Sequence, residues 1–153
     1  MQVKTDLILR DLVHLGSNLR EVDADEVIAL GHENPISSVI DCAKSSDIKY
    51  GLYIDDEIVA ACGIASYDGV FGLAWLLCTD KVANKPVWVF KTVKELLLRH
   101  TDQFEGLGNI MPEGSTNKKF VERLGFNFAP DNMEYNNQTF ERFFYHGWEQ
   151  TTK

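Results

Sequence analysis

The 153-residue chain is predicted to form a single α/β domain, with a mixed, mostly antiparallel central sheet flanked by helices. Short apolar runs of strand length alternate with stretches in which apolar residues recur every three or four positions. Along the chain these patterns read as strand, two helices, three strands, helix, strand, helix and two strands. A hydrophobic content of 44% and a charged content of 25% are typical of a globular protein with a buried core.

The domain is expected to span residues 11–147, because no linker or repeat divides this stretch. Residues 1–10 precede it as an extra arm in which Leu7, Ile8 and Leu9 are apolar, and residues 148–153 are expected to form a flexible tail. The apolar residues within 12–22 predict the first strand, with a kink at Gly16.

Two helices are expected to follow this strand. Asp23 is a good N-cap residue, and Glu26 stands three positions later, as in a capping box. Pro35 predicts the start of a second helix, which the apolar spacing continues to about residue 43.

A hairpin is the clearest local signal in the chain. Residues 50–54 and 58–65 have strand composition, and the acidic segment 55–57 separates them as a turn. A second turn at 67–69 leads into the strand 71–78. The nearly continuous apolarity of that strand suggests that it is buried on both faces.

The longest helix is expected over residues 86–99, with an apolar stripe facing the sheet. The expected stripe consists of Val87, Phe90, Val93, Leu97 and Leu98.

Four short elements are expected to complete the domain. Residues 108–111 form a strand, and 116–123 form a helix that Gly125 closes in a left-handed conformation. Residues 126–129 and 139–145 then pair as antiparallel strands.

Charge and cysteine content exclude several classes of function. The net charge is −8, whereas sequence-independent binding to nucleic acid or to anionic membranes needs clustered positive charge. No run approaches the roughly 20 apolar residues of a membrane span, and the N-terminus lacks the plan of a signal peptide, so we expect a protein that is neither transmembrane nor secreted. Cys42, Cys62 and Cys78 are odd in number and widely spaced, which favours buried thiols and no metal site.

The order of elements, together with three segments, resembles the GNAT acyltransferase superfamily over roughly residues 11–145. The segments are 18–23 (NLREVD), 72–80 (GLAWLLCTD) and 115–126 (STNKKFVERLGF). Within that superfamily the chain looks most like a phage branch related to internal virion protein A of short-tailed phages. The resemblance implies a GNAT-like sheet and places a site for acetyl-CoA at the end of the strand 71–78.

The resemblance also identifies residues that would hold this cofactor. They are Leu76, Leu77, Cys78, Lys81, Val82, Ala83, Asn84 and Lys85. Active members carry Gln/Arg-x-x-Gly-x-Gly/Ala at the start of the long helix, where glycines let backbone amides reach the diphosphate. The matching residues here are Lys81, Asn84 and Pro86, so both glycines are missing and Pro86 lacks an N–H group.

The family's catalytic groups are also replaced. An Asn that helps to hold the cofactor and a Tyr that protonates the thiolate correspond to Gly114 and Val121. For a general base the sequence offers Asp80 and Glu105, for which a helix cap or a surface charge is the alternative interpretation. The catalytic residues therefore stay unknown at this stage.

The aromatic residues near the C-terminus leave two alternatives open. Phe140, Phe143, Phe144 and Tyr145 cannot all lie on one face of a strand, because side chains alternate. Together with Trp148 they either pack inside the domain or form an exposed patch that another subunit covers.

The first functional hypothesis is a GNAT-fold phage protein that has lost catalysis and acts in the virion, near the internal core, portal or tail, through contacts with phage structural proteins or with itself. No cofactor is expected for such a protein, and it would be found in the virion or the host cytoplasm. The alternative is an active N-acetyltransferase that uses acetyl-CoA to modify a host or phage amine. A third hypothesis, a small regulator that inhibits a host factor, fits the acidity but has no motif.

Overall fold

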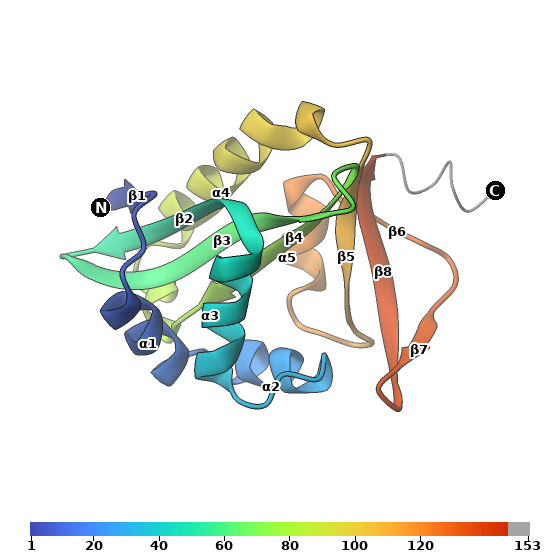
Figure 1. Ribbon diagram of the computed structural model, residues 1–153, viewed down its shortest axis with the longest axis horizontal. Coiled ribbons are helices and arrows are strands. Elements are labelled where there is room, and N and C mark those ends of the chain that lie inside the picture. Colours follow the sequence, from blue (N-terminus) through green and yellow to red (C-terminus); the bar gives the residue numbers. More distant parts are fainter. Residues whose placement is uncertain (147–153) are drawn as a thin grey trace.

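The computed structural model describes residues 1–146 and has the predicted fold class (Figure 1). Its core is an 8-stranded sheet in the order β1-β2-β3-β4-β5-β8-β6, to which β7 is added beside β8. All neighbouring strands run antiparallel except β4 and β5, which are parallel. The strands are β1 Gln2–Lys4, β2 Ser46–Ile54, β3 Glu57–Tyr67, β4 Phe71–Cys78, β5 Gly106–Pro112, β6 Asn127–Phe128, β7 Met133–Tyr135 and β8 Gln138–His146.

Helices cover both faces of the sheet. They are α1 Leu9–Ser17, α2 Glu21–Ala29, α3 Pro35–Ser45, α4 Pro86–His100 and α5 Lys118–Leu124. Helices α1 and α3 pack on one face in a cluster that includes Leu15, Val39 and Ile58, while α4 and α5 pack on the other (Figure 1). Within the described part of the chain, no helix is long and apolar enough to cross a membrane.

The first predicted strand is wrong, because residues 12–22 form α1 and the beginning of α2. Leu12, Leu15 and Gly16 are the buried residues of α1, and their spacing of three and four is helical. Gly16 does not kink a strand. A Cβ at this position would lie 2.6 Å from the Cα of Ile36, so glycine lets α1 and α3 approach closely.

The expected arm contains the edge strand of the sheet. Strand β1 pairs antiparallel with β2, with Val3 opposite Leu52, and α1 already begins at Leu9. The expected tail, 148–153, lies outside the described residues.

The predicted hairpin is confirmed as β2 and β3. Its turn consists of Asp55 and Asp56, with φ values of 51° and 64°. Two positive φ values in succession are those of a type I′ turn, whose twist matches that of the flanking strands. The predicted helix at Pro35 is also confirmed, and Asn34 caps it by accepting a hydrogen bond from the Ser37 N–H.

The long helix begins at Pro86 as predicted and ends one residue later than predicted, at His100, but the predicted buried face is partly wrong. Its buried residues are Val89, Val93, Leu96 and Leu97. Val87 and Leu98 are 64% and 48% exposed, because the stripe that faces the sheet follows Val89, Val93, Leu96 and Leu97 along the helix.

The C-terminal elements follow the prediction, with one addition. Gly125 ends α5 with a φ of 110°, and β6 pairs with β8 as expected. The hairpin of β7 and β8 was not predicted, although Asn136 and Asn137 form its turn with φ values of 50° and 61°, which asparagine tolerates. Among the described aromatic residues of β8, Phe140 and Phe143 are buried and Phe144 and Tyr145 are half-buried, so they form no exposed patch. Trp148 lies outside the described residues.

Candidate functional site

A cavity opens where the parallel strands β4 and β5 separate. Their pairing begins at Phe71 opposite Gly106 and stops at Leu73 opposite Gly108. Just beyond, the Asn109 side chain bridges the gap by donating from Nδ2 to the Ala74 carbonyl at 2.9 Å. The cavity lies past this bridge and has a volume of about 370 Å³, within the range of small-molecule sites.

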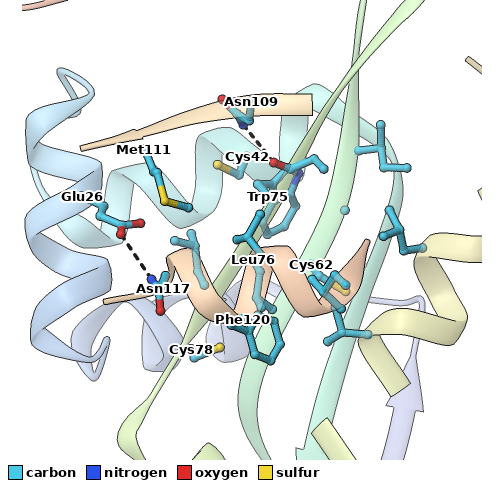
Figure 2. Close-up of a pocket in the computed structure, with 18 of the residues that line it drawn as sticks. Glu26, Cys42, Cys62, Trp75, Leu76, Cys78, Asn109, Met111, Asn117 and Phe120 are labelled. Carbon is cyan, nitrogen blue, oxygen red and sulfur yellow. Dashed lines mark hydrogen bonds between the residues drawn. The ribbon is translucent and has the colours of Figure 1, made fainter. Parts of the chain in front are cut away.

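Most of the cavity wall is apolar (Figure 2). Leu76 projects from β4, Met111 from β5 and Phe120 from α5, so three elements distant in sequence meet around the same space. The cavity reaches both sides of the sheet, since Trp75 belongs to the cluster under α1 and α3 whereas Leu76 packs against the cluster under α4.

The three cysteines also line this cavity, but none is an activated nucleophile. Burial raises the pKa of the Cys62 thiol to about 12 and that of Cys42 to about 11, and it raises the pKa of Cys78 as well. Thiols are nucleophilic only when deprotonated, so these side chains act as small apolar wall residues at neutral pH.

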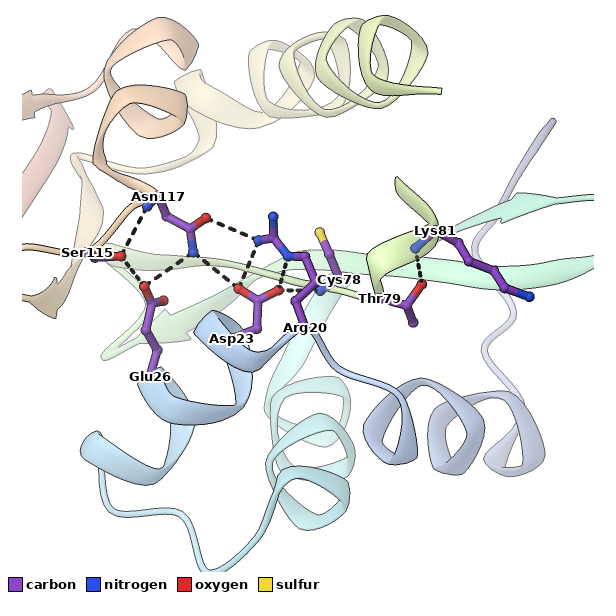
Figure 3. Close-up of polar contacts among 8 residues, drawn as sticks. All are labelled: Arg20, Asp23, Glu26, Cys78, Thr79, Lys81, Ser115 and Asn117. Atoms are coloured by element: carbon purple, nitrogen blue, oxygen red, sulfur yellow. Dashed lines mark hydrogen bonds and ion pairs between the residues drawn. The ribbon is translucent and has the colours of Figure 1, made fainter. Parts of the chain in front are cut away.

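A buried carboxylate, that of Asp23, joins α2 to β4 and to the segment before α5 (Figure 3). Arg20 donates to it twice, from Nε to Oδ2 at 2.9 Å and from Nη2 to Oδ1 at 3.0 Å. The Cys78 backbone N–H donates to Oδ2 at 3.0 Å, and Asn117 Nδ2 donates to Oδ1 at 3.2 Å. Asp23 was predicted as an N-cap, but α2 begins two residues earlier and its N-cap residue is Arg20.

Glu26 lies one turn further along α2, and its carboxylate borders the cavity. Both of its hydrogen bonds fall on Oε1, which accepts from Ser115 Oγ and, at 3.2 Å, from Asn117 Nδ2. Burial raises the pKa of Glu26, and the nearby negative charge of Asp23 acts in the same direction. Sequence reasoning missed this group because it assigned Glu26 to a capping box.

The two bases proposed from the sequence lie elsewhere. Asp80 is exposed at the start of the loop after β4, and Glu105 is exposed just before β5. Neither residue lines the cavity. Val121, in the position of the family's tyrosine, does line it, and Gly114 occupies a left-handed turn with a φ of 80°.

The predicted cofactor-binding residues divide into two groups. Leu76, Leu77, Cys78 and Val82 line the cavity. Lys81, Ala83, Asn84 and Lys85 are exposed and lie outside it.

Along the edge of β4 that faces the gap, some backbone groups already have hydrogen-bond partners. Backbone groups of alternate residues point to the same side of a strand, so Ala74, Leu76 and Cys78 face away from β3. The Cys78 carbonyl accepts from the Arg20 N–H at 2.8 Å, and its N–H is held by Asp23. The Ala74 carbonyl is thus bonded to Asn109, and the backbone of Cys78 is bonded to residues at the start of α2. Leu76 lies between them, and its backbone groups face the cavity.

The loop after β4 is closed on itself. Residues Asp80–Asn84 form a 3₁₀ helix that Thr79 caps by accepting from the Lys81 N–H. The N–H groups of Val82 and Lys85 donate to the carbonyls of Thr79 and Val82, respectively. Backbone N–H groups that donate hydrogen bonds within such a turn are not available to bind an anion.

The positive charge of Lys81 in this loop is paired with a carboxylate. Lys81 Nζ donates to Glu57 Oε1 at 2.5 Å, and His14 Nε2 lies 2.8 Å from the other oxygen of that carboxylate. The hydrogen bonds from Lys81 and His14 lower the pKa of Glu57. The cavity therefore has room for the narrow end of a CoA molecule, but the loop does not fit its diphosphate.

Among residues 1–146, no group of three or more His, Cys, Asp or Glu side chains could hold a metal ion.

Comparison with solved structures shows that the chain has the fold of the GNAT acetyltransferases. No protein-family model and no curated protein sequence matches it. An acetyltransferase from Streptococcus agalactiae is 13% identical, with 93% of this chain and 96% of that chain covered and a TM-score of 0.64. A GNAT-family acetyltransferase from Streptococcus pneumoniae is 10% identical, with 94% and 96% covered and a TM-score of 0.59. A Bacillus subtilis acetyltransferase in complex with CoA is 8% identical, with 94% and 96% covered and a TM-score of 0.62.

Proposed function

We propose that this chain is a GNAT-fold protein that does not transfer acetyl groups from CoA and acts by binding other proteins, in a phage virion as the sequence resemblance implies. The observation that carries the proposal is the closed loop at Asp80–Asn84. It lies where the fold would hold the diphosphate, its amides are engaged internally, and Pro86, the first residue of α4, has no N–H to offer.

Two further features agree with the loss of transfer. Lys81 is paired with Glu57, so its charge is already compensated. Val121 cannot donate a proton to a leaving thiolate, and the cysteines near it have raised pKa values.

A surface suited to a protein partner lies at the N-terminal end. Exposed large hydrophobic side chains lie in β1 and α1 and directly before each of them, and these two elements form an edge of the sheet and part of one outer layer. They are Met1, Val3, Ile8, Leu9 and Val13. Exposed apolar groups beside an unpaired strand edge are features of protein contact sites.

Calorimetric titration with acetyl-CoA and with CoA tests the loss of cofactor binding. We expect no measurable heat and no thermal shift at millimolar ligand. Binding tighter than about 100 μM, or roughly −5.5 kcal/mol, would contradict the proposal.

The proposed partner is tested by affinity capture of virion proteins with the wild type and with an Ile8→Glu/Leu9→Glu variant. We expect the wild type to retain a structural protein that the variant loses. Val87→Glu changes an exposed apolar residue on α4, which packs on the other face of the sheet from α1, and should retain the partner. Equal capture by all three proteins would exclude the N-terminal surface as the contact.

An active N-acetyltransferase is the second candidate. One specific observation favours it, namely the cavity between β4 and β5, which has a carboxylate of raised pKa at its wall. Release of free thiol from acetyl-CoA in the presence of an amine would support this candidate. The same titration separates the two functions, because an enzyme must bind its donor.

A further inference from the structure

Helix α4 has a stripe of apolar and positively charged side chains on its solvent side. The stripe consists of Val87, Lys91, Lys94 and Leu98. Their spacings of four, three and four residues place them on one side of the helix, and all four are exposed. Lys94 Nζ lies over the Phe90 ring, but within the described part of the chain neither lysine forms an ion pair. The α4 stripe therefore offers two positive charges between two apolar ends.

Helix α2 has a stripe of the opposite charge on its solvent side. Glu21, Asp25 and Ile28 are separated by four and three residues, so they also share one side of their helix, and all three are exposed. Neither of the two carboxylates forms an ion pair with another residue of the range 1–146. The net charge of the chain is −8, so the α2 stripe has the prevailing sign and the α4 stripe is the exception.

The two stripes also match in length. A helix rises about 1.5 Å per residue, so seven residues cover about 10.5 Å. Glu21 lies seven residues from Ile28, and each lysine lies seven residues from one apolar end of the α4 stripe. When the helices lie side by side with Ile28 on either apolar end, Glu21 comes level with one lysine. Asp25 then lies within about 1.5 Å of the other lysine along the helix axis.

The two stripes lie on opposite sides of the molecule. Val27 of α2 belongs to the cluster under α1 and α3, whereas Val93 of α4 belongs to the cluster on the other face of the sheet (Figure 1). The two stripes of one chain therefore cannot meet each other. A contact between two different surfaces on opposite sides of a molecule continues from copy to copy, and it does not close into a two-fold dimer.

We propose that copies of this chain associate head to tail, with the α4 stripe of one copy seated on the α2 stripe of the next. Each contact pairs two lysines with two carboxylates and packs Ile28 on an apolar end of the α4 stripe. The complementary charges select this pairing, because two copies of the same stripe would repel each other. A contact of two helix faces is small, so the association is weak and reversible. It goes beyond the function proposed above, because it uses neither the N-terminal surface nor the cavity.

Sedimentation of the full chain over a series of concentrations tests the proposal. We expect the average mass to rise continuously and to exceed that of a dimer at roughly 1 mM protein, as for an open-ended contact with a Kd of about 100 μM. A chain that stays monomeric over this range, or a mass that stops at that of a dimer, would overturn the proposal.

Two charge-reversed variants identify the surfaces that meet. One is Lys91→Glu/Lys94→Glu, and the other is Glu21→Lys/Asp25→Lys. Each variant alone should remain monomeric, because both of its stripes then have the same sign. An equimolar mixture should associate again, since each stripe of one variant meets a stripe of opposite charge on the other. Failure of the mixture of folded variants to associate would refute the pairing of α4 with α2.

Lys119→Glu/Arg123→Glu is the matched control, because it makes the same change in net charge on exposed residues of α5. It should associate as the wild type does, and its failure to do so would attribute the loss to net charge instead of to the stripes. The Ile8→Glu/Leu9→Glu variant, which tests the proposed function, should also associate normally. The contact between copies and the contact with a virion protein can therefore fail independently.

Discussion

At the scale of single residues, Asp23 connects more parts of the site than the other described residues, through four hydrogen bonds. Its side chain is 1% exposed, and the carboxylate receives hydrogen bonds from Arg20 at the N-cap of α2, from β4 and from the segment before α5. It therefore holds α2 against the strand that borders the cavity. Its contact with the Cys78 N–H also occupies a backbone group that would otherwise face the gap between β4 and β5.

Asp23→Ala is predicted to lower the free energy of unfolding by about 3–5 kcal/mol. The substitution removes four accepted hydrogen bonds and leaves the half-buried Arg20 guanidinium without a carboxylate partner, with only its hydrogen bond to Asn117 Oδ1. Urea unfolding measures the change. Asp25→Ala, on the exposed face of the same helix, should cost less than about 1 kcal/mol. Similar losses in both variants would mean that the buried carboxylate has no special role.

Glu26→Gln is predicted to change how stability depends on pH. Because burial raises the pKa of Glu26 in the folded state, its protonated form is favoured by folding. The resulting stabilisation is present below the pKa of the unfolded chain and is lost as the pH rises through the folded value. The stability of the variant relative to the wild type should therefore increase as the pH rises above the pKa of an unfolded glutamate, about 4.3.

Thermal unfolding at several pH values checks this expectation. Glu122→Gln is the control, because its side chain is exposed, and its difference from the wild type should stay constant across the same range. A Glu26→Gln difference that also stays constant would contradict a raised pKa at this position.

At the scale of elements, the sequence predicted those whose signals are local. Pro35 starts a helix and Gly125 ends one, and the acidic pair Asp55 and Asp56 forms the hairpin turn, because each signal depends on the backbone preferences of one or two residues. The segment that became α1 was misread because Leu12 and Leu15 fit a short strand as well as one helical turn. Packing against α3 decides between these alternatives.

The candidate site was predicted only in part for a similar reason. Leu76, Leu77, Cys78 and Val82 belong to one strand and its loop, so a continuous segment identified them. Glu26 reaches the same cavity from a helix whose start was misplaced. The 3₁₀ turn after β4, which closes the loop, depends on its capping by Thr79 and has no sequence signature that distinguishes it from an open loop.

The pairing of β5 with β8 supplies a prediction at this scale. A Cβ added to Gly108 would lie 2.2 Å from the Phe143 carbonyl oxygen, so any side chain there must push the two strands apart. Gly108→Ala is predicted to lower the free energy of unfolding by about 3 kcal/mol. Denaturant unfolding measures this value.

Gly114→Ala provides a graded comparison. Gly114 has a positive φ of 80°, but a Cβ there meets no atom within 4 Å. This substitution should cost only about 1–2 kcal/mol, from the left-handed backbone alone. A smaller loss in Gly108→Ala than in Gly114→Ala would show that β5 and β8 adjust easily to the added methyl group.

At the scale of the whole molecule, the features of the sequence that form the fold differ from those that a cofactor-binding loop would need. The sheet, the splayed strands and the two apolar clusters need only the burial pattern of the chain, and they form the GNAT fold at sequence identities near 10%. Binding of the diphosphate would depend instead on the backbone amides of the loop Asp80–Asn84 and of the first turn of α4, whose conformation the burial pattern does not determine. A chain can therefore form the cavity although its loop does not bind a diphosphate.

This separation predicts that cofactor binding can be restored without changing the core. Asn84→Gly combined with Pro86→Gly returns both glycines of the family motif, and the second change restores an N–H group at the first residue of α4. Adding Glu57→Gln would release Lys81 from its ion pair. We expect the triple variant to bind CoA at least tenfold more tightly than the wild type, a gain of about 1.4 kcal/mol by calorimetry.

The control is Ala83→Gly with Lys85→Gly, which adds the same number of glycines to the loop outside the motif. It should lose stability to a similar extent and gain no affinity, because it leaves Pro86 and the Lys81 pair in place. If the folded triple variant also fails to bind CoA, the obstacle lies in the strand and not in the loop. The contact of Asp23 with the Cys78 N–H would then be the feature that closes the β4 edge to a cofactor.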